Sequence, residues 1–224
     1  MSTRLTLFDL DHTLLDGDSD VLWCDFLIDK GLLERGEFSA RNADMATRYQ
    51  AGTVGLKEFA DFYVGTLAGR TIAFWEPYRR EFLSDWIRPR ITPAARTLVR
   101  QHQNADDVIA LTTATNRFIT ELTAEEFGIE HLIATEPEIR AECFTGKTTG
   151  VLNMRDGKVE RLAYWLSARG MDLEDCDSTA YSDSINDLPL LEAVRTPVAV
   201  NADARLAAIA TARGWPRLSL RQPA

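Results

Sequence analysis

The chain alternates short apolar runs with longer stretches whose apolar residues recur every three or four positions. The runs have the length of strands buried on both faces of a sheet, and the longer stretches have the spacing of amphipathic helices. Strands are expected at residues 5–10, 108–112, 132–135, 179–182 and 197–200. Because strands that alternate with helices form parallel sheets, we predict an α/β fold with a doubly wound, Rossmann-like parallel sheet as its core.

The helices between these strands are marked by their end signals. Thr92 and Pro93 are typical of an N-cap followed by proline in the first turn, and they predict a helix to about residue 102. Further helices are expected to end near Gly128, to cover residues 158–169 and to begin at Leu188.

Residues 16–88 carry helical spacing without an alternating strand pattern. The clearest helix covers residues 56–67, and others are expected at about residues 21–30, 40–50 and 72–87. Because this stretch separates the first two strands, we interpret it as a small all-helical cap. It would be inserted into an α/β core made of residues 1–15 and 89–224.

Composition narrows the classes of partner. The 224 residues include 25 Lys and Arg against 34 Asp and Glu, a formal net charge of −9. Because nucleic acids and anionic membranes are bound through basic residues, we expect neither as the main partner. The three cysteines include no C-x-x-C pair, so neither a disulfide framework nor a zinc site is suggested.

The hydropathy of the chain indicates where in the cell the protein is expected. No apolar run approaches the roughly 18 residues of a membrane span, and acids at positions 9 and 11 interrupt the run that a signal peptide needs. The chain is therefore expected to be soluble and cytoplasmic. The sequence leaves its oligomeric state open.

Two acidic pairs follow predicted strands. Asp9 and Asp11 end the first strand, with Thr13 at the next alternate position, and Asp183 and Asp187 follow the strand at residues 179–182. Ligands of open α/β sheets bind at the carboxyl ends of strands, where alternate side chains lie on one side of the chain. Surface loops, and helix capping by Asp187, are the alternative interpretations. Carboxylates gathered from two strand ends favour a hard cation, with magnesium preferred.

A lysine and a cluster of hydroxyls are candidates for binding an anion. Lys158 stands in the first turn of a predicted helix, where a cation is unfavourably placed unless it faces an anion or extends into solvent. Hydroxyl and amide groups at residues 112–116 lie between the second strand and its helix, where an anion site or simple capping would explain them.

Along the chain, the first acidic pair is followed by the hydroxyl cluster, then by Lys158 and then by the second acidic pair. This order gives the chain a resemblance to the haloacid dehalogenase-like phosphatase superfamily, in particular its phosphoserine phosphatase-like branch. The four motifs are FDLDHT, LTTAT, GKVERL and YSDSINDLP, and they span residues 8–189. The helical insert lies where that branch carries its cap. Lys147, in TGKTTG, competes with Lys158 as the family's lysine, but no helix is predicted behind it.

The resemblance implies a mechanism. Asp9 would attack the phosphorus of a small phosphate monoester and form an aspartyl phosphate, and Asp11 would act as general acid and then as general base. Magnesium would be held by the carboxylates of Asp9 and Asp183 and by the backbone carbonyl of Asp11.

The remaining motif residues take binding and supporting roles in the same resemblance. Lys158 and Thr113 would bind the phosphoryl oxygens, and Asn186 is a further substrate-binding candidate. Thr13 and Asp187 would support the site, and the cap would close over it and select the substrate.

The chain departs from phosphoserine phosphatases at the residues that hold their substrate. The cap acid that holds the substrate amine there would be Asp18 here, one methylene shorter, and the helix at residues 56–67 has no arginine for a substrate carboxylate. Arg48 and Arg70 are the nearby alternatives. Ala114-Thr115 replaces the family's glycine pair. Phosphoserine-like compounds and histidinol phosphate both stay open as substrates.

Three other functions use similar residues. A phosphotransferase or mutase would pass the aspartyl phosphate to another hydroxyl. A phospho-acceptor signalling module of the receiver kind would keep it, although about 95 residues between the first two strands are hard to fit into such a module. A binding protein that has lost catalysis would not need every motif.

Overall fold

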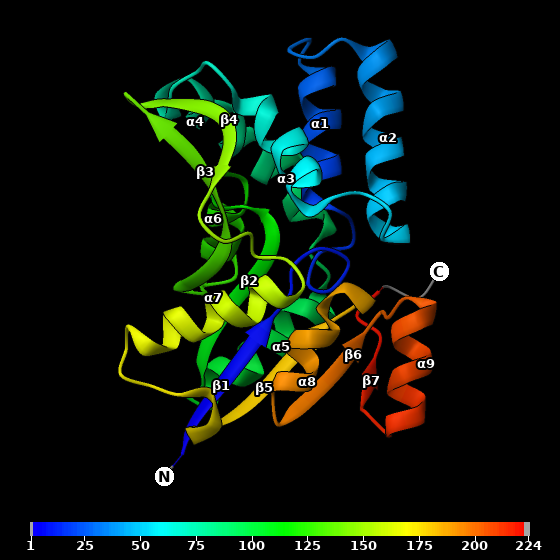
Figure 1. The fold of residues 1–224 in the computed structure, drawn as a ribbon, viewed down its shortest axis with the longest axis vertical. Helices are drawn as coiled ribbons and strands as arrows, with labels where there is room; N and C mark the ends of the chain where they lie inside the picture. The colour runs from blue at the N-terminus through cyan, green and yellow to red at the C-terminus, as the bar shows by residue number, and fades with distance from the viewer. Residues whose placement is uncertain (1, 222–224) are drawn as a thin grey trace.

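The computed structural model describes residues 2–221, which form one mixed sheet covered by helices (Figure 1). The strand order is β4-β3-β2-β1-β5-β6-β7, and all neighbouring strands are parallel except the antiparallel pair β3 and β4. The strands are β1 (Thr3–Phe8), β2 (Val108–Asn116), β3 (His131–Arg140), β4 (Cys143–Thr149), β5 (Cys176–Ser182), β6 (Thr196–Val200) and β7 (Arg217–Leu218). The predicted α/β fold with a mostly parallel, doubly wound sheet is confirmed.

Helices cover both faces of the sheet because successive residues of each strand point to opposite sides. In β1, Leu5 and Leu7 join a core with α7, α8 and α9, whereas Phe8 joins the core on the other face with α5 and α6. The helices are α5 (Pro93–Asn104), α6 (Arg117–Glu126), α7 (Asp156–Ser167), α8 (Leu188–Ala193) and α9 (Ala204–Arg213). Thr92 caps α5 as predicted, accepting a hydrogen bond from the amide of Ala95.

The elements between β1 and α5 are all helical, and they form a helical segment. Its helices are α1 (Ser19–Asp29), α2 (Arg35–Ala51), α3 (Leu56–Val64) and α4 (Ile72–Phe82), with a 3₁₀ turn at Gly65–Leu67 between α3 and α4. A π-helical turn at Leu83–Ile87 and a 3₁₀ turn at Arg88–Arg90 follow α4. They lie beyond the end of the sheet to which β1 points (Figure 1). Trp23, Phe26 and Phe82 of this segment share a buried cluster with Phe8, so its base is continuous with the core. That residues 16–88 form a separate cap domain stays a prediction.

An antiparallel hairpin extends from the sheet to the helical segment. β3 continues to Arg140 and turns through Ala141 and Glu142 into β4. Phe144 of β4 exchanges backbone hydrogen bonds with Gly69 and Arg70, which lie between the Gly65–Leu67 turn and α4. The helical segment is therefore attached to the core through a strand as well as through its own two ends.

The sequence interpretation missed several of these elements. β4, β7 and α9 were not expected, β3 is longer than residues 132–135, and α7 begins at Asp156 rather than at Lys158. β4 has a single fully buried residue, Phe144, so its sequence does not show the continuous apolar run used to find strands.

Within the described residues, no helix combines the length and the apolar character that crossing a membrane requires.

Candidate active site

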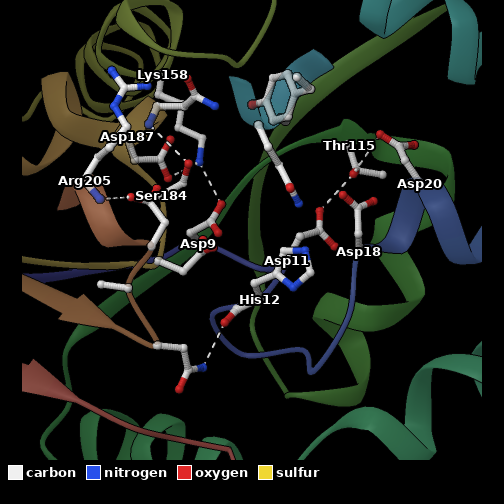
Figure 2. A pocket seen from close by; sticks show the side chains of 18 of the residues that line it. Asp9, Asp11, His12, Asp18, Asp20, Thr115, Lys158, Ser184, Asp187 and Arg205 are labelled. Carbon is white, nitrogen blue, oxygen red and sulfur yellow. Dashed lines mark hydrogen bonds and ion pairs between the residues drawn. The ribbon is translucent and has the colours of Figure 1, made fainter. Parts of the chain in front are cut away.

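A cavity of about 480 Å³ opens where β1, β2 and β5 end, beneath the helical segment (Figure 2). The acids that follow β1 line it together with those that follow β5. The expectation that the two acidic pairs meet at one edge of the sheet therefore holds in the structure.

Lys158 lies in an ion-paired group at the floor of this cavity. Its Nζ is 2.7 Å from Oδ1 of Asp9 and 2.6 Å from Oδ2 of Asp187, and the hydroxyl of Ser182 donates to the same Asp187 oxygen at 2.7 Å. Lys158 is 2% exposed, which excludes extension into solvent. Asp187 precedes α8, but its side chain makes no capping hydrogen bond and faces Lys158 instead.

Thr13 connects the two acidic pairs. Its hydroxyl is 3.1 Å from Oδ2 of Asp9 and 3.3 Å from Oδ1 of Asp183. Both oxygens of Asp9 are therefore held, one by Lys158 and the other by Thr13. This arrangement fixes the plane of the Asp9 carboxylate at the end of β1.

Asp11, two residues after Asp9, also faces the cavity, and it lies on the side of Asp9 away from Asp187 (Figure 2). Its Oδ1 accepts the amide of Ser19 at 2.7 Å, and its Oδ2 accepts the hydroxyl of Thr115 at 3.0 Å. Asp18 also lines the cavity and caps α1 by accepting the amide of Val21 at 3.0 Å.

Burial dominates the electrostatics of these carboxyls. It raises the pKa of Asp9 to about 7, against the opposing charge of Lys158. Burial, together with the charge of Asp18, raises the pKa of Asp11 to about 6. Burial and the neighbouring Asp9 also raise the pKa of Asp183 well above its usual range. For Lys158, burial acts against the charge, but Asp187 and Asp9 outweigh it and raise the pKa.

The donor set suits a hard divalent cation, although within residues 2–221 no three His, Cys, Asp or Glu side chains are already arranged around a common point as metal ligands. Thr13 brings the carboxylates of Asp9 and Asp183 to one hydroxyl. Full ionisation of the three carboxyls of Asp9, Asp183 and Asp187 would leave excess negative charge against the one positive charge of Lys158, and a bound cation would offset it. Oxygen donors with excess negative charge are the environment that magnesium prefers.

Of the other residues predicted for the site, one lines the cavity and two do not. Asn186 lines the cavity. Thr113 is fully buried below it, where its hydroxyl accepts the amide of Thr115 at 3.2 Å and lies 3.4 Å from Oδ2 of Asp11. Lys147 is exposed on β4 and is not among the residues that line the cavity.

Sequence reasoning missed several residues at the site. Asp20 and Ser182 make buried hydrogen bonds there, and Tyr49 and Phe59 line the wall formed by the helical segment. The rings of Tyr49 and Phe59 stack with their centroids 4.0 Å apart. The apolar face of α3 indicated that Phe59 is buried, but helical spacing alone does not distinguish a core residue from a cavity residue.

Comparisons with known proteins agree with this geometry. The family model described as haloacid dehalogenase-like hydrolase matches residues 6–192. A histidinol-phosphatase of Neisseria meningitidis is 40% identical over 220 residues, which cover 97% of this chain and 99% of that protein. A phosphoserine phosphatase of Mycobacterium tuberculosis is 31% identical over 221 residues, covering 95% of this chain and 70% of that protein.

A solved structure shows the same fold over the full length. It is a protein of unknown function from Bordetella pertussis, with a TM-score of 0.94 and 45% sequence identity, and the match covers 99% of this chain and 100% of that one. The chain thus belongs to the haloacid dehalogenase-like hydrolase family, which confirms the resemblance carried by its motifs, and it is an enzyme of the phosphatase class.

Proposed function

We propose that this enzyme is a magnesium-dependent phosphatase that hydrolyses a small phosphate monoester through an aspartyl phosphate on Asp9. One observation carries the proposal. The carboxylate of Asp9 is held on both oxygens at the end of β1, while the carboxylate of Asp11, two residues further, faces the same cavity. One acid is thereby oriented as a nucleophile, and a second is placed for proton transfer.

Asp9 forms the covalent intermediate. An oxygen of its carboxylate bonds to phosphorus as the bond from phosphorus to the alcohol oxygen breaks. Lys158 lies 2.7 Å from Asp9, so its charge is available both to keep Asp9 ionised and to stabilise the phosphoryl oxygens. Asp187 and Ser182 keep Lys158 in place from the other side.

Asp11 moves the proton in both half-reactions. It protonates the leaving alcohol oxygen and then accepts a proton from the water that hydrolyses the aspartyl phosphate. A pKa raised to about 6 by burial and by Asp18 suits a group that must both hold and release a proton near neutral pH.

Magnesium would be held by the carboxylates of Asp9 and Asp183 and by the backbone carbonyl of Asp11. When bound, it would supply the positive charge that lets an anionic carboxylate approach an anionic ester. Thr13 contributes by keeping the two carboxylates together.

The part of the cavity wall that the helical segment contributes favours a substrate with a cationic and an aromatic group. Asp18, Tyr49 and Phe59 line the cavity from the helical segment. Arg48 instead pairs with Glu58 at 3.0 Å, and Arg70 lies over the ring of Phe74, so neither of these arginines serves a substrate carboxylate in the cavity.

Histidinol phosphate fits this wall better than phosphoserine does. It carries an ammonium group and an imidazole ring but no carboxylate, which matches an acid and two aromatic rings. The full-length similarity to the histidinol-phosphatase of Neisseria meningitidis supports the same choice. The cytoplasmic location and the lack of nucleic-acid or membrane partners stay predictions from the sequence.

A direct assay tests the proposal. We expect phosphate release from histidinol phosphate at a higher kcat/KM than from phosphoserine, with magnesium required and with Asp9→Asn inactive on both. Released phosphate should equal the alcohol formed, which separates hydrolysis from transfer to another hydroxyl. Equal or better turnover of phosphoserine would contradict the substrate assignment, and activity of Asp9→Asn would contradict the mechanism.

A further inference from the structure

Behind Asp11, on the side away from Asp9, lies a chain of buried hydrogen bonds (Figure 2). The hydroxyl of Thr115 is 3.0 Å from Oδ2 of Asp11 and 3.1 Å from Oδ2 of Asp20, and the hydroxyl of Ser19 donates to it at 3.1 Å. Thr115 is 2% exposed, Asp20 4% and Ser19 1%. The reaction steps described above use none of these three side chains.

Counting protons shows that one of the two carboxyls is neutral. A hydroxyl has one hydrogen to donate and two lone pairs that accept. Thr115 accepts from Ser19 and stands within hydrogen-bond distance of two carboxyl oxygens, so it donates to only one of them. The other carboxyl must supply the hydrogen of its own bond to Thr115.

The surroundings identify the neutral carboxyl as Asp20. Asp11 has a donor at each oxygen besides Thr115, the amide of Ser19 at 2.7 Å from Oδ1 and the hydroxyl of Thr113 at 3.4 Å from Oδ2. Oδ1 of Asp20 is buried and has no hydrogen-bond partner among the described residues. Burial, together with the charges of Asp18 and Asp11, also raises the pKa of Asp20 well above its usual range.

We propose that Thr115 and Asp20 are positioning residues for Asp11. A neutral Asp20 donates to Thr115, and Thr115 is thereby set to donate to Oδ2 of Asp11 and not to accept from it. Each carboxylate oxygen offers two lone pairs, so Oδ1 of Asp11, which accepts the amide of Ser19, keeps one position for the proton exchanged with substrate and water. The inference rests on the proposed role of Asp11 as general acid and base.

The test compares two esters that differ in their need for an acid. An alkyl phosphate such as histidinol phosphate needs protonation of its leaving oxygen, whereas p-nitrophenyl phosphate needs little. Thr115→Val removes the hydroxyl at nearly constant volume. We expect kcat for the alkyl ester to fall by about 10–100-fold, the range for losing a group that orients an active-site ligand. KM should stay unchanged, and kcat for p-nitrophenyl phosphate should fall less.

Conservative variants separate positioning from simple packing. Thr115→Ser restores the hydroxyl and should recover most of the alkyl-ester rate. Asp20→Asn keeps a neutral group that donates to Thr115 and should stay close to the parent, whereas Asp20→Ala should resemble Thr115→Val. Thr6→Val removes a similarly buried hydroxyl that donates to Asp107 at 2.9 Å, and it should leave the ratio of the two rates unchanged.

Two results would overturn the inference. One is an unchanged rate ratio in Thr115→Val, and the other is an Asp20→Asn variant as slow as Asp20→Ala. Asp11→Asn distinguishes this failure from failure of the proposed function. If Asp11→Asn shifts the rate ratio and Thr115→Val does not, the positioning role alone is wrong, whereas an unchanged ratio in Asp11→Asn would contradict the role of Asp11 itself.

An infrared measurement covers the case in which a variant does not fold. At neutral pH and with magnesium present, the carbonyl band of protonated buried carboxyls should be weaker in folded Asp20→Asn than in the parent, by the intensity of one carboxyl. Equal bands in the two proteins would show that Asp20 is not the neutral group.

Discussion

At the scale of single residues, burial distinguishes the two lysines that the sequence offers for the site. It is buried between Asp9 and Asp187, whereas Lys147, the other sequence candidate, is exposed on β4. Burying a lysine is unfavourable unless opposite charges compensate it, and here two carboxylates do so. Its charge is therefore held next to Asp9, the proposed nucleophile.

Lys158→Ala should lower kcat by about 10²-fold or more, the scale of losing one electrostatic contact to a transition state. Lys147→Ala is the matched control, and it should stay within a few-fold of the parent. Phosphate release under saturating substrate measures both. If Lys147→Ala were the more damaging change, the assignment of the lysine would be reversed.

The raised pKa of Asp11 has a consequence for stability. Its pKa is about 6 in the folded protein against a usual value of 3.8, so the folded state binds the proton more tightly than the unfolded state does. Its contribution to stability is therefore present at low pH and is lost as pH rises through about 6. With magnesium chelated, Asp11→Asn should raise the free energy of unfolding at pH 7 by about 1–2 kcal/mol.

Urea unfolding at two pH values checks this. The difference between Asp11→Asn and the parent should be present at pH 7 and should shrink toward pH 4, where the Asp11 carboxyl is protonated in the folded protein. A variant that is less stable than the parent at pH 7 would mean that the ionised carboxylate stabilises the fold.

At the scale of elements, the hairpin of β3 and β4 attaches the helical segment to the core. Phe144 of β4 is 1% exposed and packs edge-on against Phe118 of α6, with ring centroids 5.0 Å apart. Beside it, Asp61 of α3 accepts the amide and the hydroxyl of Thr148 at 3.1 and 3.0 Å. The hairpin thus holds one wall of the cavity against the sheet.

Phe144→Ala should lower the free energy of unfolding by about 3–5 kcal/mol, the usual cost of removing a buried phenyl ring. Ile139→Ala lies on the same hairpin, but Ile139 is 43% exposed, so the change should stay within about 0.5 kcal/mol. Urea denaturation of both variants measures the difference. Equal losses would show that Phe144 does not anchor the hairpin.

Buried strands and edge strands differ in how well the sequence predicts them. A strand buried on both faces along its second half, such as β1, is visible as an apolar run that is followed by acids. β4 lies at a sheet edge with one buried residue, so its pairing depends on contacts distant in sequence.

Contacts between residues distant in the sequence also limit how far the site could be predicted. Asp9, Asp11, Thr115, Asp183 and Lys158 lie in motifs, whereas the contact of Asp20 with Thr115 depends on α1 meeting β2, which the spacing of residues does not reveal.

At the scale of the whole molecule, the fold gathers three carboxyl groups and one lysine in one buried place. Asp9, Asp183 and Asp187 come from two segments far apart in the sequence, and folding brings them around Lys158. A cation that binds only the folded state would stabilise the protein by mass action. Magnesium should therefore affect stability as well as activity.

Magnesium at about 100 times its Kd should raise the free energy of unfolding by about 2.7 kcal/mol. The corresponding rise in Tm should be lost or much reduced in Asp183→Asn, which keeps the shape of the side chain but removes its charge. Asp203→Asn is a suitable control, because Asp203 caps α9 and lines the outer cavity. An equal shift in Asp183→Asn and the parent would place the metal elsewhere.

Chemical identification of the phosphorylated residue decides whether Asp9 is the nucleophile. Asp11→Asn keeps the nucleophile but lacks the group that activates water, so it should accumulate phosphoenzyme when given labelled p-nitrophenyl phosphate and magnesium. After acid quenching, the label should map to Asp9, and an Asp9→Asn protein treated in the same way should carry none. Label on another residue, or on the Asp9→Asn protein, would contradict the account.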